Sequence, residues 1–441
     1  MISAEQNELM TRTGSDTPAG KLLRRYWQPV ALVDELAGPR PLRAVKLMGQ
    51  DFVVFRDEQG RLGMLDRDCP HRGADLAFGR LEDGGLRCLL HGWLFDVKGK
   101  CLQTPAERAG SRLASSIRQG AYPVVEKSGI VFAYIGPGEP PAFPAFDCFV
   151  APETHVFAFK GLFECNWLQA LEVGIDPAHA SYLHRYFEDD NPAEGYGKQF
   201  RGASADSQMP ITKVLREYEA PDIRVDTVEW GMRLTALRHL NDSQTHVRVT
   251  NLLFPQAFVI PMSPEMTISQ WHVPVDDTHC YWYAIFTSFT DAVDKAQMRE
   301  QRLELYELPD YTSRRNKRNN YGYSIEEQAT QTYTGMGLDI NVHDQWAVES
   351  QGPIRDRTRE HLASTDKAIA IYRRMLVDAI DRTRAGRDDI PMRLDAARAA
   401  ALEGPPAIDG VGSSDDVDRY AVEADRKRRE ASSWASKRLT A

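Results

Sequence analysis

Two short cysteine–histidine pairs, separated by sixteen residues, carry the most distinctive chemistry in this sequence. The first pair is Cys69-Pro-His71, and the second is Cys88-Leu-Leu-His91. Cysteine thiolates and histidine imidazoles are the ligands that zinc ions and iron–sulfur clusters take from proteins. The spacing therefore predicts a metal centre that draws one cysteine and one histidine from each of two loops.

Three features of these pairs favour an iron–sulfur cluster over a tetrahedral zinc ion. Both pairs lie between expected strands, not on the helix that a zinc finger would use. Gly73 and Gly92 follow the pairs closely, and glycine lets the backbone pass near a cluster and donate N–H groups to its sulfides. Each loop supplies one ligand of each type, which suits a Rieske [2Fe–2S] cluster, where two histidines replace two cysteines on one iron. We expect a Rieske cluster, with zinc as the alternative.

A second candidate metal site, with His179 and His184 as ligands and Asp176 just before them, follows later in the chain. Two imidazoles and one distant carboxylate form the facial triad of non-heme Fe(II) oxygenases, which leaves positions open for O₂. Residues five apart on an α-helix point about 140° apart, so both histidines reach one metal only through a helix break or a π-bulge. Pro177 fits a helix start just after Asp176. The alternative interpretation is two ordinary helix histidines.

The elements that must position these groups follow from hydrophobic periodicity. A helical pattern opens the chain, short alternating strands follow from about residue 43, and a proline-rich stretch begins at Pro137. The second half begins with a strand and a helical segment, continues with strands from Lys213 onward, and ends in helical periodicity. We predict a helical arm (1–42), a Rieske domain (43–136), a linker (137–154), a catalytic mononuclear iron domain (155–386) and a C-terminal extension (387–441) that is part helix and part irregular surface wrap.

The predicted fold class is α+β. An N-terminal all-β Rieske domain precedes a catalytic domain in which an antiparallel sheet is flanked by helices, similar to a helix-grip arrangement.

Composition excludes several functional classes. A net charge of −9 argues against nucleic-acid binding, which needs clustered Lys and Arg. No apolar run approaches the roughly 18–20 residues of a membrane span, and the first residues lack the features of a signal peptide, so we expect a cytoplasmic protein.

No glycine-rich dinucleotide fingerprint follows a strand, so electrons must come from a separate NAD(P)H-dependent reductase or ferredoxin. A patch around Arg72, Arg87, Lys98 and Lys100 could meet such a partner, although nearby acids almost cancel its charge.

Taken together, Cys69-x-His-Arg-Gly and Cys88-x-x-His-Gly-Trp resemble the Rieske domain of ring-hydroxylating and demethylating oxygenases. Asp176-x₂-His-x₄-His resembles their mononuclear iron motif, and the resemblance covers about residues 5–385. A late family motif, an Asp five residues before a Glu, implies Asp344 as the third iron ligand, with Glu349 as its competitor. The adjacent His343 is expected to be a core or surface histidine.

The resemblance also implies a role for Asp176. This residue matches the family's bridging acid, which would accept one hydrogen bond from a cluster histidine of a neighbouring subunit, here His91, and another from His179. A head-to-tail ring of subunits supplies that short route, and a homotrimer is the family expectation. The sequence departs from many relatives where Val173, and not Asn, follows Glu172.

The run from Glu349 to Ile369 looks like the phthalate-dioxygenase branch, which includes oxygenases that demethylate lignin-derived methoxy-aromatics. This branch implies O₂-dependent hydroxylation or O-demethylation of an aromatic, often carboxylated, substrate, with cis-dihydroxylation of a phthalate-like acid as the alternative. Arg248 alternates with apolar residues on a catalytic strand; facing inward it could clamp a substrate carboxylate, and facing outward it would be solvated. A non-catalytic Rieske electron carrier is a remote alternative, because a carrier needs neither the iron motif nor a second domain.

Overall fold

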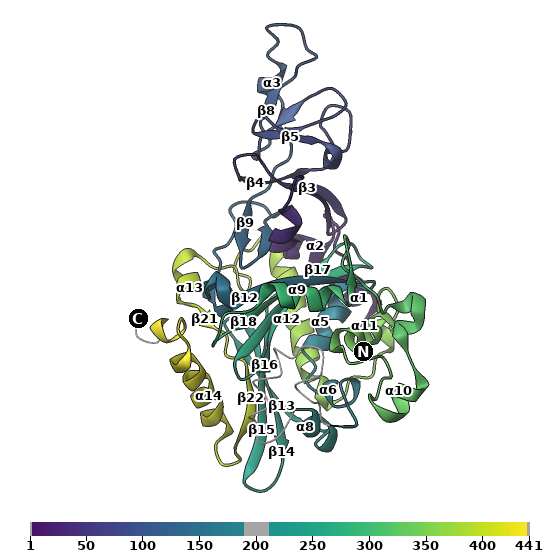
Figure 1. The fold of residues 1–441 in the computed structure, drawn as a ribbon, viewed down its shortest axis with the longest axis vertical. Coiled ribbons are helices and arrows are strands. Elements are labelled where there is room, and N and C mark those ends of the chain that lie inside the picture. The colour runs from purple at the N-terminus through teal and green to yellow at the C-terminus, as the bar shows by residue number, and fades with distance from the viewer. Residues whose placement is uncertain (1, 189–210, 439–441) are drawn as a thin grey trace.

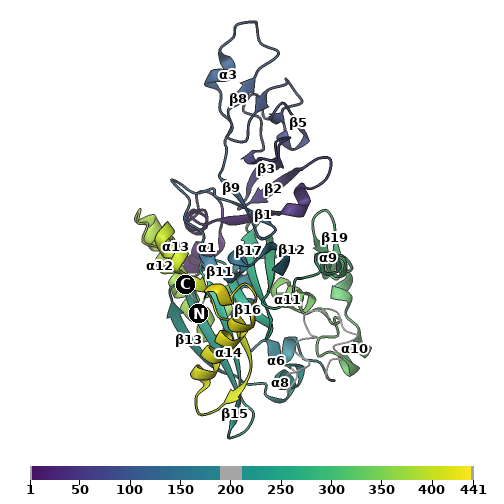
Figure 2. The ribbon, with the colours of Figure 1, turned by 60° about the vertical axis from the view of Figure 1, so that its left-hand side comes forward.

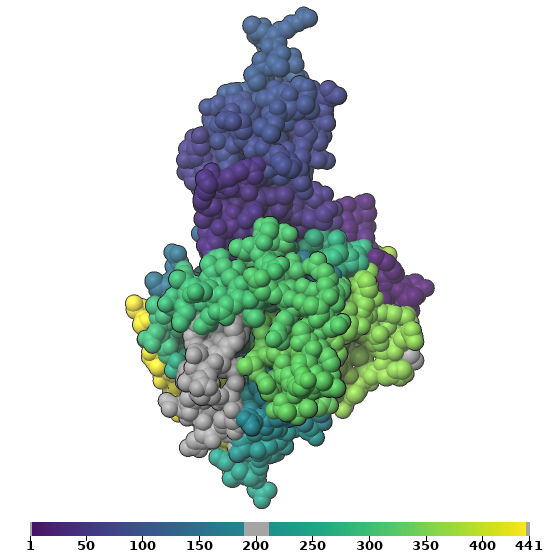
Figure 3. All heavy atoms as spheres, turned by 45° about the vertical axis from the view of Figure 1, so that its right-hand side comes forward, coloured from purple at the N-terminus to yellow at the C-terminus, as the bar shows by residue number. Residues whose placement is uncertain are grey.

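Short antiparallel strands build an upper lobe that stands above the rest of the chain (Figures 1 and 3). The computed structural model describes residues 2–188 and 211–438. The first sheet of this lobe is β2 (Leu42–Leu47), β3 (Gln50–Arg56) and β4 (Leu62–Asp66); the second is β5 (Arg80–Glu82), β6 (Gly85–Arg87), β7 (Leu94–Phe95) and β8 (Cys101–Gln103); the third is β1 (Gln28–Leu32), β10 (Ile130–Ala133) and β9 (Val124–Lys127).

Strand β3 divides the upper lobe between two apolar cores. Phe52 and Val54 join the large core that continues into the lower lobe, whereas Val53 and Phe55 join a smaller core. Side chains alternate between the two faces of a strand, so four consecutive apolar residues are stable only where both faces are covered. The smaller core includes Cys69 and Cys88, and it therefore fixes the loops that carry them.

The N-terminal segment is helical as expected at α1 (Ala4–Thr11) and α2 (Pro18–Leu23). It also supplies β1, which pairs antiparallel with β10. Strand β10 lies at the other end of the sequence that forms the upper lobe. The first 42 residues thus contribute a strand to this lobe in addition to a helical arm.

A mostly antiparallel sheet forms the lower lobe, in agreement with the α+β prediction. Its strand order is β13 (Asp222–Val228), β14 (Gly231–His239), β15 (Gln244–Leu253), β16 (Ala257–Ser263), β17 (Met266–Pro274), β18 (Cys280–Ser288), β12 (Val156–Phe163), β20 (Thr312–Ser313) and β19 (Tyr306–Glu307), and β22 (Ile408–Ser413) also pairs with β15.

Helices surround this sheet (Figures 1 and 2). They are α4 (Asp147–Val150), α5 (Trp167–Gly174), α6 (Ala180–Leu183), α8 (Ile211–Glu217), α9 (Lys295–Leu303), α10 (Ile325–Thr330), α11 (Ile340–Glu349), α12 (Lys367–Arg384), α13 (Ala396–Ala401) and α14 (Val417–Ala431); α3 (Leu113–Ser116) lies in the upper lobe. The strand expected at Lys213 is wrong, because Thr212, Val214 and Leu215 are buried on the short helix α8 and do not alternate. Across the described ranges, no helix has the length and apolar character needed to cross a membrane.

The C-terminal extension is an integral part of the sheet in the lower lobe, and not an irregular wrap. Strand β22 pairs with β15, β21 (Glu403–Gly404) pairs with β11 (Ala145–Phe146), and α14 lies across the outer face of the sheet (Figure 2). The sequence pattern did not predict β22 because Gly410 and Gly412 resemble an interruption of regular secondary structure. Both lack a side chain because the Tyr420 ring covers them, so that an added Cβ would lie 2.1 and 2.4 Å from Tyr420 atoms.

Candidate metal centres

Two loops of matching geometry carry the four predicted cluster ligands. In each loop the cysteine N–H donates to the carbonyl five residues later, at 2.9 Å for Cys69 and 2.8 Å for Cys88. The glycine four residues after each cysteine donates back to the cysteine carbonyl, at 2.8 Å for Gly73 and 3.0 Å for Gly92. Both glycines have a φ of +73°, a conformation that other residues adopt only under strain. The repeated glycine of the sequence pattern is therefore what closes each loop.

The four ligands converge from these loops. The His71 and His91 rings lie 4.3 Å apart between centroids, and Trp93 stacks on His71 at 4.4 Å. Burial, together with the neighbouring Cys88 thiol, raises the pKa of the Cys69 thiol to about 11. Within the described chain, His71 Nδ1 is buried without a hydrogen-bond partner. Adjacent thiols and adjacent imidazoles fit a [2Fe–2S] cluster with one Cys-bound and one His-bound iron.

A helix break brings the two histidines of the second motif together. Helix α5 begins at the cap residue Asn166, whose side chain accepts a hydrogen bond from Leu168 N at 3.1 Å. It ends at Gly174, where a Cβ would lie 2.0 Å from the Phe258 ring. The next helix, α6, is four residues long and has His179 at its N-cap and His184 at its C-cap. The sequence analysis offered a helix break or a π-bulge as the way to bring both histidines to one metal. The chain adopts the break.

His179, His184 and Asp344 form a compact triangle of ligand atoms. The two Nε2 atoms are 3.3 Å apart, and Asp344 Oδ1 lies 3.3 Å from His184 Nε2 and 3.8 Å from His179 Nε2. Neighbouring ligands at right angles around a metal are about 3 Å apart for bonds of about 2.1 Å. The three groups therefore fit a facial triad on a divalent iron, with the opposite positions left for O₂ or water.

The second nitrogen of each imidazole is held by a protein acceptor. His179 Nδ1 donates to the Asp176 carbonyl, and His184 Nδ1 lies 3.4 Å from His343 Nδ1. Because His343 Nε2 donates to Gly337 O at 2.9 Å, its Nδ1 is free to accept from His184. The Nε2 atoms of His179 and His184 therefore carry no proton, and each keeps a lone pair that can bind a metal. His343 is buried and contacts the candidate ligand His184, a role that sequence reasoning missed because only the fold brings the two rings together.

Electrostatics support a metal-binding protonation state. Burial, and then the neighbouring His184, lower the pKa of His179. Burial alone would raise the pKa of Asp344, but His184, His179 and His343 together hold it below its usual value. Neutral imidazoles and an ionised carboxylate are the forms in which these side chains bind metals.

The geometry of Asp176 differs in part from its family-derived role. Its carboxylate Oδ1 accepts from Ala178 N at 2.9 Å, and it is the main-chain carbonyl of Asp176, not its carboxylate, that accepts from His179. Asp176 still lies directly beside His179, a candidate iron ligand.

Glu172 is held by two buried arginines. Its carboxylate accepts from Arg357 Nη2 at 2.8 Å and from Arg373 Nε at 2.6 Å. Burial would raise the pKa of Glu172, but the two guanidinium groups hold it below its usual value. Arg373 also binds Glu360 at 2.6 Å. These partners lie far along the chain, and they anchor α5.

Glu349, the competing ligand candidate, forms hydrogen bonds with groups other than the two histidines. Its carboxylate accepts hydrogen bonds from Glu164 N at 2.8 Å, Tyr321 Oη at 2.9 Å and Gln345 Nε2 at 3.0 Å. Since it lies five residues from Asp344 on α11, it faces another side of the helix. It fixes α11 against the chain before α5 and leaves Asp344 to face the two histidines.

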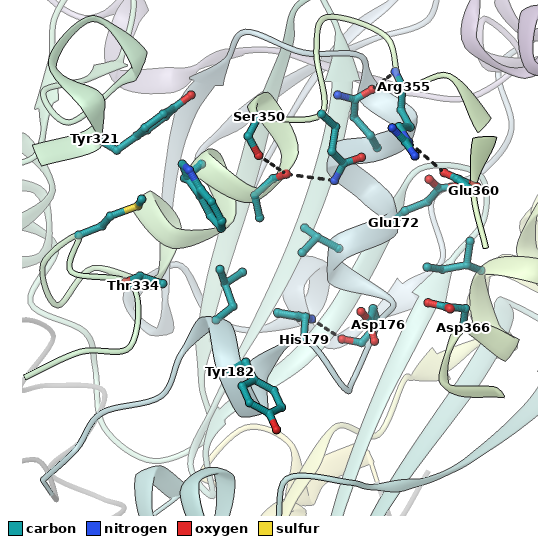
Figure 4. A pocket seen from close by; sticks show the side chains of 18 of the residues that line it. Glu172, Asp176, His179, Tyr182, Tyr321, Thr334, Ser350, Arg355, Glu360 and Asp366 are labelled. Carbon is teal, nitrogen blue, oxygen red and sulfur yellow. Dashed lines mark hydrogen bonds and ion pairs between the residues drawn. The ribbon is translucent and has the colours of Figure 1, made fainter. Parts of the chain in front are cut away.

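A groove of about 1310 Å³ opens beside Asp176 and His179. Figure 4 shows Asp176, His179 and Tyr182 gathered at one end of this groove, with Tyr321 and Ser350 toward the other. We call it the Asp176 groove. Its exposed apolar side chains are Tyr182, Tyr323, Tyr333, Trp346 and Leu362.

Arg248 faces the metal side of the sheet, but its guanidinium already has a carboxylate partner. Nη1 forms an ion pair with Asp409 of β22, and Nη2 donates to Pro261 O at 3.0 Å. Neither sequence alternative, an open inward clamp or a solvated outward side chain, describes this arrangement. The partner lies in the C-terminal extension, which the sequence did not place in the sheet.

Models of known families match both lobes. The Rieske [2Fe-2S] domain model matches residues 26–123, and a model described as LigXa C-terminal domain like matches residues 133–424. The second match alone covers more than half of the chain.

Three similar proteins are oxygenase subunits. The chain is 35% identical to a phthalate 4,5-dioxygenase oxygenase subunit of Pseudomonas putida, over 88% of this chain and 89% of that protein. It is 34% identical to a tert-butanol monooxygenase / tert-amyl alcohol desaturase oxygenase subunit of Aquincola tertiaricarbonis, over 86% and 77%. It is 30% identical to a 5,5'-dehydrodivanillate O-demethylase oxygenase subunit of a Sphingobium strain, over 92% and 87%.

Proposed function

This chain belongs to the oxygenase components of the Rieske-type aromatic oxygenases, and on that premise we propose that it hydroxylates or O-demethylates an aromatic compound with O₂. The observation that carries the proposal is the triangle of His179, His184 and Asp344 ligand atoms, with edges of 3.3–3.8 Å, in the same chain as two Cys–His loops. A simple electron carrier needs the loops but not the triangle.

Each residue has a defined task in this proposal. Cys69 and Cys88 would hold one iron of the Rieske cluster and His71 and His91 the other, while the triangle would hold a mononuclear Fe(II). When bound, that iron supplies O₂ activation with electrons that the cluster delivers.

The surrounding residues keep the ligands in their binding form. His343 and the Asp176 carbonyl hold the Nδ1 protons of the two imidazoles, so that their Nε2 lone pairs stay directed at the metal. Glu349 and Glu172 fix α11 and α5, the elements that carry or precede the ligands.

We further propose that the active unit is a homotrimer in which a second copy docks its cluster loops in the Asp176 groove. Within one chain, β5–β8 and α6 lie at opposite ends of the molecule (Figures 1 and 2). Around the cluster loops, Phe78, Leu89 and Leu90 are 66%, 61% and 54% exposed. Apolar groups on both surfaces favour their burial against each other, and a head-to-tail contact of this kind closes into a ring. His91 of one copy would then meet Asp176 of the next.

The electron donor is proposed to be a separate NAD(P)H-dependent reductase, a ferredoxin or both, in the cytoplasm where the nicotinamide is available. The relatives named above are oxygenase subunits, which supports a multicomponent system. The basic patch around Arg87 gives little support for its docking site, because Arg87 is paired with Glu82 at 2.5 Å and Asp83 at 2.7 Å.

The names of the relatives support particular types of reaction for this protein. One is named for O-demethylation of an aromatic, which supports the main proposal, and one for dioxygenation of phthalate, which keeps cis-dihydroxylation as the alternative. A third acts on a tertiary alcohol, so a neutral substrate is within reach of this architecture.

Turnover of a substrate panel tests the proposal. Purified protein, a generic reductase and NADH are incubated with methoxybenzoates, methoxyphenols, biaryl ethers and phthalate. Formaldehyde release with a phenolic product supports O-demethylation, a ring-hydroxylated product supports hydroxylation, and a diol supports dihydroxylation. A colourless protein that carries stoichiometric zinc would reject the cluster and the function with it.

A further inference from the structure

Helix α6 is too short to hold its own shape. It runs over Ala180–Leu183, with His179 at its N-cap and His184 at its C-cap. An isolated helix is marginal in water below about 12–15 residues, because few hydrogen bonds offset the ordering of its first turn. The distance between these two candidate iron ligands therefore depends on contacts that α6 makes with the rest of the chain.

A buried arginine of the sheet supplies such contacts. Arg238, near the end of β14, is 1% exposed. Its Nη2 donates to Ser181 Oγ at 3.0 Å and to Pro177 O at 3.4 Å, and its Nε donates to Tyr218 O at 2.9 Å. Pro177 lies two residues before His179, and Ser181 lies two residues after it. One guanidinium group thus holds the chain on both sides of a candidate iron ligand.

The alternation of side chains along β14 explains why Arg238 reaches α6. Its neighbour Leu237 packs under α14 with Val417, on the outer face of the sheet. Successive side chains of a strand point to opposite faces, so Arg238 points to the inner face. Leu234 shares that face and belongs to the same apolar core as Leu171 of α5, the helix that precedes the ligand segment. Arg238 therefore extends from the side of the sheet on which the ligand segment lies.

A second arginine contacts the same residue of α6. Ser181 is fully buried, and its carbonyl accepts from Arg185 Nε at 2.9 Å. Arg185, which directly follows His184, also binds the exposed carboxylate of Glu219 at 2.5 Å. Ser181 is thus held through its hydroxyl from the sheet and through its carbonyl from the end of its own helix. Its position midway between the two histidines makes it the point at which α6 is fixed.

The burial of Arg238 is not explained by stability. All three of its acceptors are uncharged, and its Nη1 is buried with no hydrogen-bond partner among the described residues. Burial lowers the pKa of Arg238 to about 10, so the guanidinium group still carries its charge at neutral pH. A buried charge without a directly paired opposite charge destabilises a fold. The contribution of this side chain is therefore its contact with the ligand segment.

We propose that Arg238 is a positioning residue for the candidate mononuclear iron site. Its planar guanidinium group, with donors in a fixed fork, holds Pro177 and Ser181 relative to the sheet and thereby sets the place of His179 in the ligand triangle. The inference rests on the proposed oxygenase function, because it assigns a task within the metal site of that function.

Arg238→Met tests this assignment, because Met keeps a long side chain and donates no hydrogen bond. We expect Co(II) to bind the iron-depleted full chain about tenfold more weakly than in the parent, the lower end of the range for residues that orient metal ligands. Titration calorimetry measures the affinity. The EPR signal of bound high-spin Co(II), recorded with the cluster oxidised and diamagnetic, reports the ligand geometry and should change.

Arg233→Met is the matched control, since Arg233 carries the same charge on the same strand but points to the outer face. It should leave the Co(II) affinity and the EPR signal as in the parent. Ser181→Ala removes only the hydroxyl that accepts from Arg238, and it should cause part of the loss. Added to Arg238→Met, it should cause no further loss, because both changes break one contact.

An Arg238→Met protein that binds Co(II) as Arg233→Met does, with an unchanged EPR signal, would overturn the inference even if its thermal stability falls. A purely structural residue lowers stability without moving the metal ligands. Should Arg238→Met fail to fold, seen as loss of the cluster absorption, Ser181→Ala decides alone, and parental affinity and EPR in that variant overturn the inference. A parent that binds no Co(II) would instead contradict the metal site itself, and with it both the proposed function and this inference.

Discussion

His343 Nδ1 lies 3.4 Å from His184 Nδ1, while the other ring nitrogen of His343 donates to the Gly337 carbonyl at 2.9 Å. The carbonyl fixes the tautomer of His343, and His343 in turn fixes that of His184. His343, which follows the candidate ligands in sequence beside Asp344, thus orients the His184 ring in space. Burial, and then His184, lower the pKa of His343 to about 4, which keeps it the neutral acceptor that this arrangement needs.

Replacing His343 by Phe should weaken metal binding, because Phe keeps the ring but accepts no hydrogen bond. We expect a loss of about 10–100-fold in affinity for Fe(II) or Co(II), the range for groups that orient metal ligands, with the cluster spectrum unchanged. Titration of iron-depleted protein with Co(II) measures it. His239→Phe, at the exposed end of β14, is the matched control. Unaltered Co(II) affinity in His343→Phe would show that the contact has no orienting role.

Replacing His179, His184 or Asp344 by Ala should remove the mononuclear iron and keep the cluster. Two protein ligands hold a labile Fe(II) poorly, so iron per subunit should fall from about three to about two while the visible absorption of the cluster persists. Iron analysis and absorption spectra are read on the same sample. An Asp344→Ala protein with full iron content would mean that another carboxylate is the ligand, and Glu349 would be examined next.

Asp176→Asn should block electron transfer and leave both metal sites intact. The Asn side-chain oxygen can still accept from Ala178 N, so the turn before α6 is preserved. An amide, however, cannot accept a charge-assisted hydrogen bond as a carboxylate does. We expect normal iron content and a large loss of turnover, measured as oxidation of the pre-reduced cluster in a single turnover with substrate and O₂. Cluster oxidation at the parent rate would remove Asp176 from the pathway.

Leu90→Glu should disrupt the proposed docking of the cluster loops in the Asp176 groove. A charge introduced into a buried apolar contact loses its hydration without gaining a partner, so the trimer should dissociate or lose turnover. Analytical ultracentrifugation and oxygen uptake follow the two effects. Leu102→Glu, on β8 of the same lobe and 39% exposed, is the control outside the loops. A Leu90→Glu trimer with parental turnover would place the interface elsewhere.

His272 should make the protein sensitive to mild acid. Burial lowers its pKa to about 3, beside Phe163 and Phe258. An unfolded histidine has a pKa of about 6.5, so between these values the unfolded state binds a proton that the folded state does not, and the free energy of unfolding decreases as pH falls. From pH 7.5 to 5 this contributes a loss of about 2 kcal/mol, which His272→Phe should remove.

Urea unfolding of parent and His272→Phe at both pH values measures this difference. His239→Phe, at an exposed position, should not reproduce it. Equal pH dependence in the parent and the His272→Phe protein would assign the acid sensitivity to other groups.

The sequence by itself determined the groups whose chemistry depends on near neighbours. Cys69, His71, Cys88 and His91 sit in loops that close through hydrogen bonds spanning four or five residues, and Gly73 and Gly92 are needed at those points. The same holds for the His179–His184 pair, because a regular α-helix cannot bring residues five apart to one metal without a break or a π-bulge. Rules of this kind act within a single turn, so a linear pattern contains them.

Only the tertiary structure decided which distant groups these residues meet. Arg248 meets Asp409 across 161 residues, Glu172 meets Arg357 and Arg373, and His184 meets His343. Alternation along β15 shows that one face is apolar, but not which helix or strand covers the other. That choice depends on packing of the whole core and on β22 joining the sheet, where glycines that read as a chain break make room for Tyr420. The candidate iron ligands can therefore be predicted from the sequence, whereas the residues that orient them come together only when the sheet is assembled.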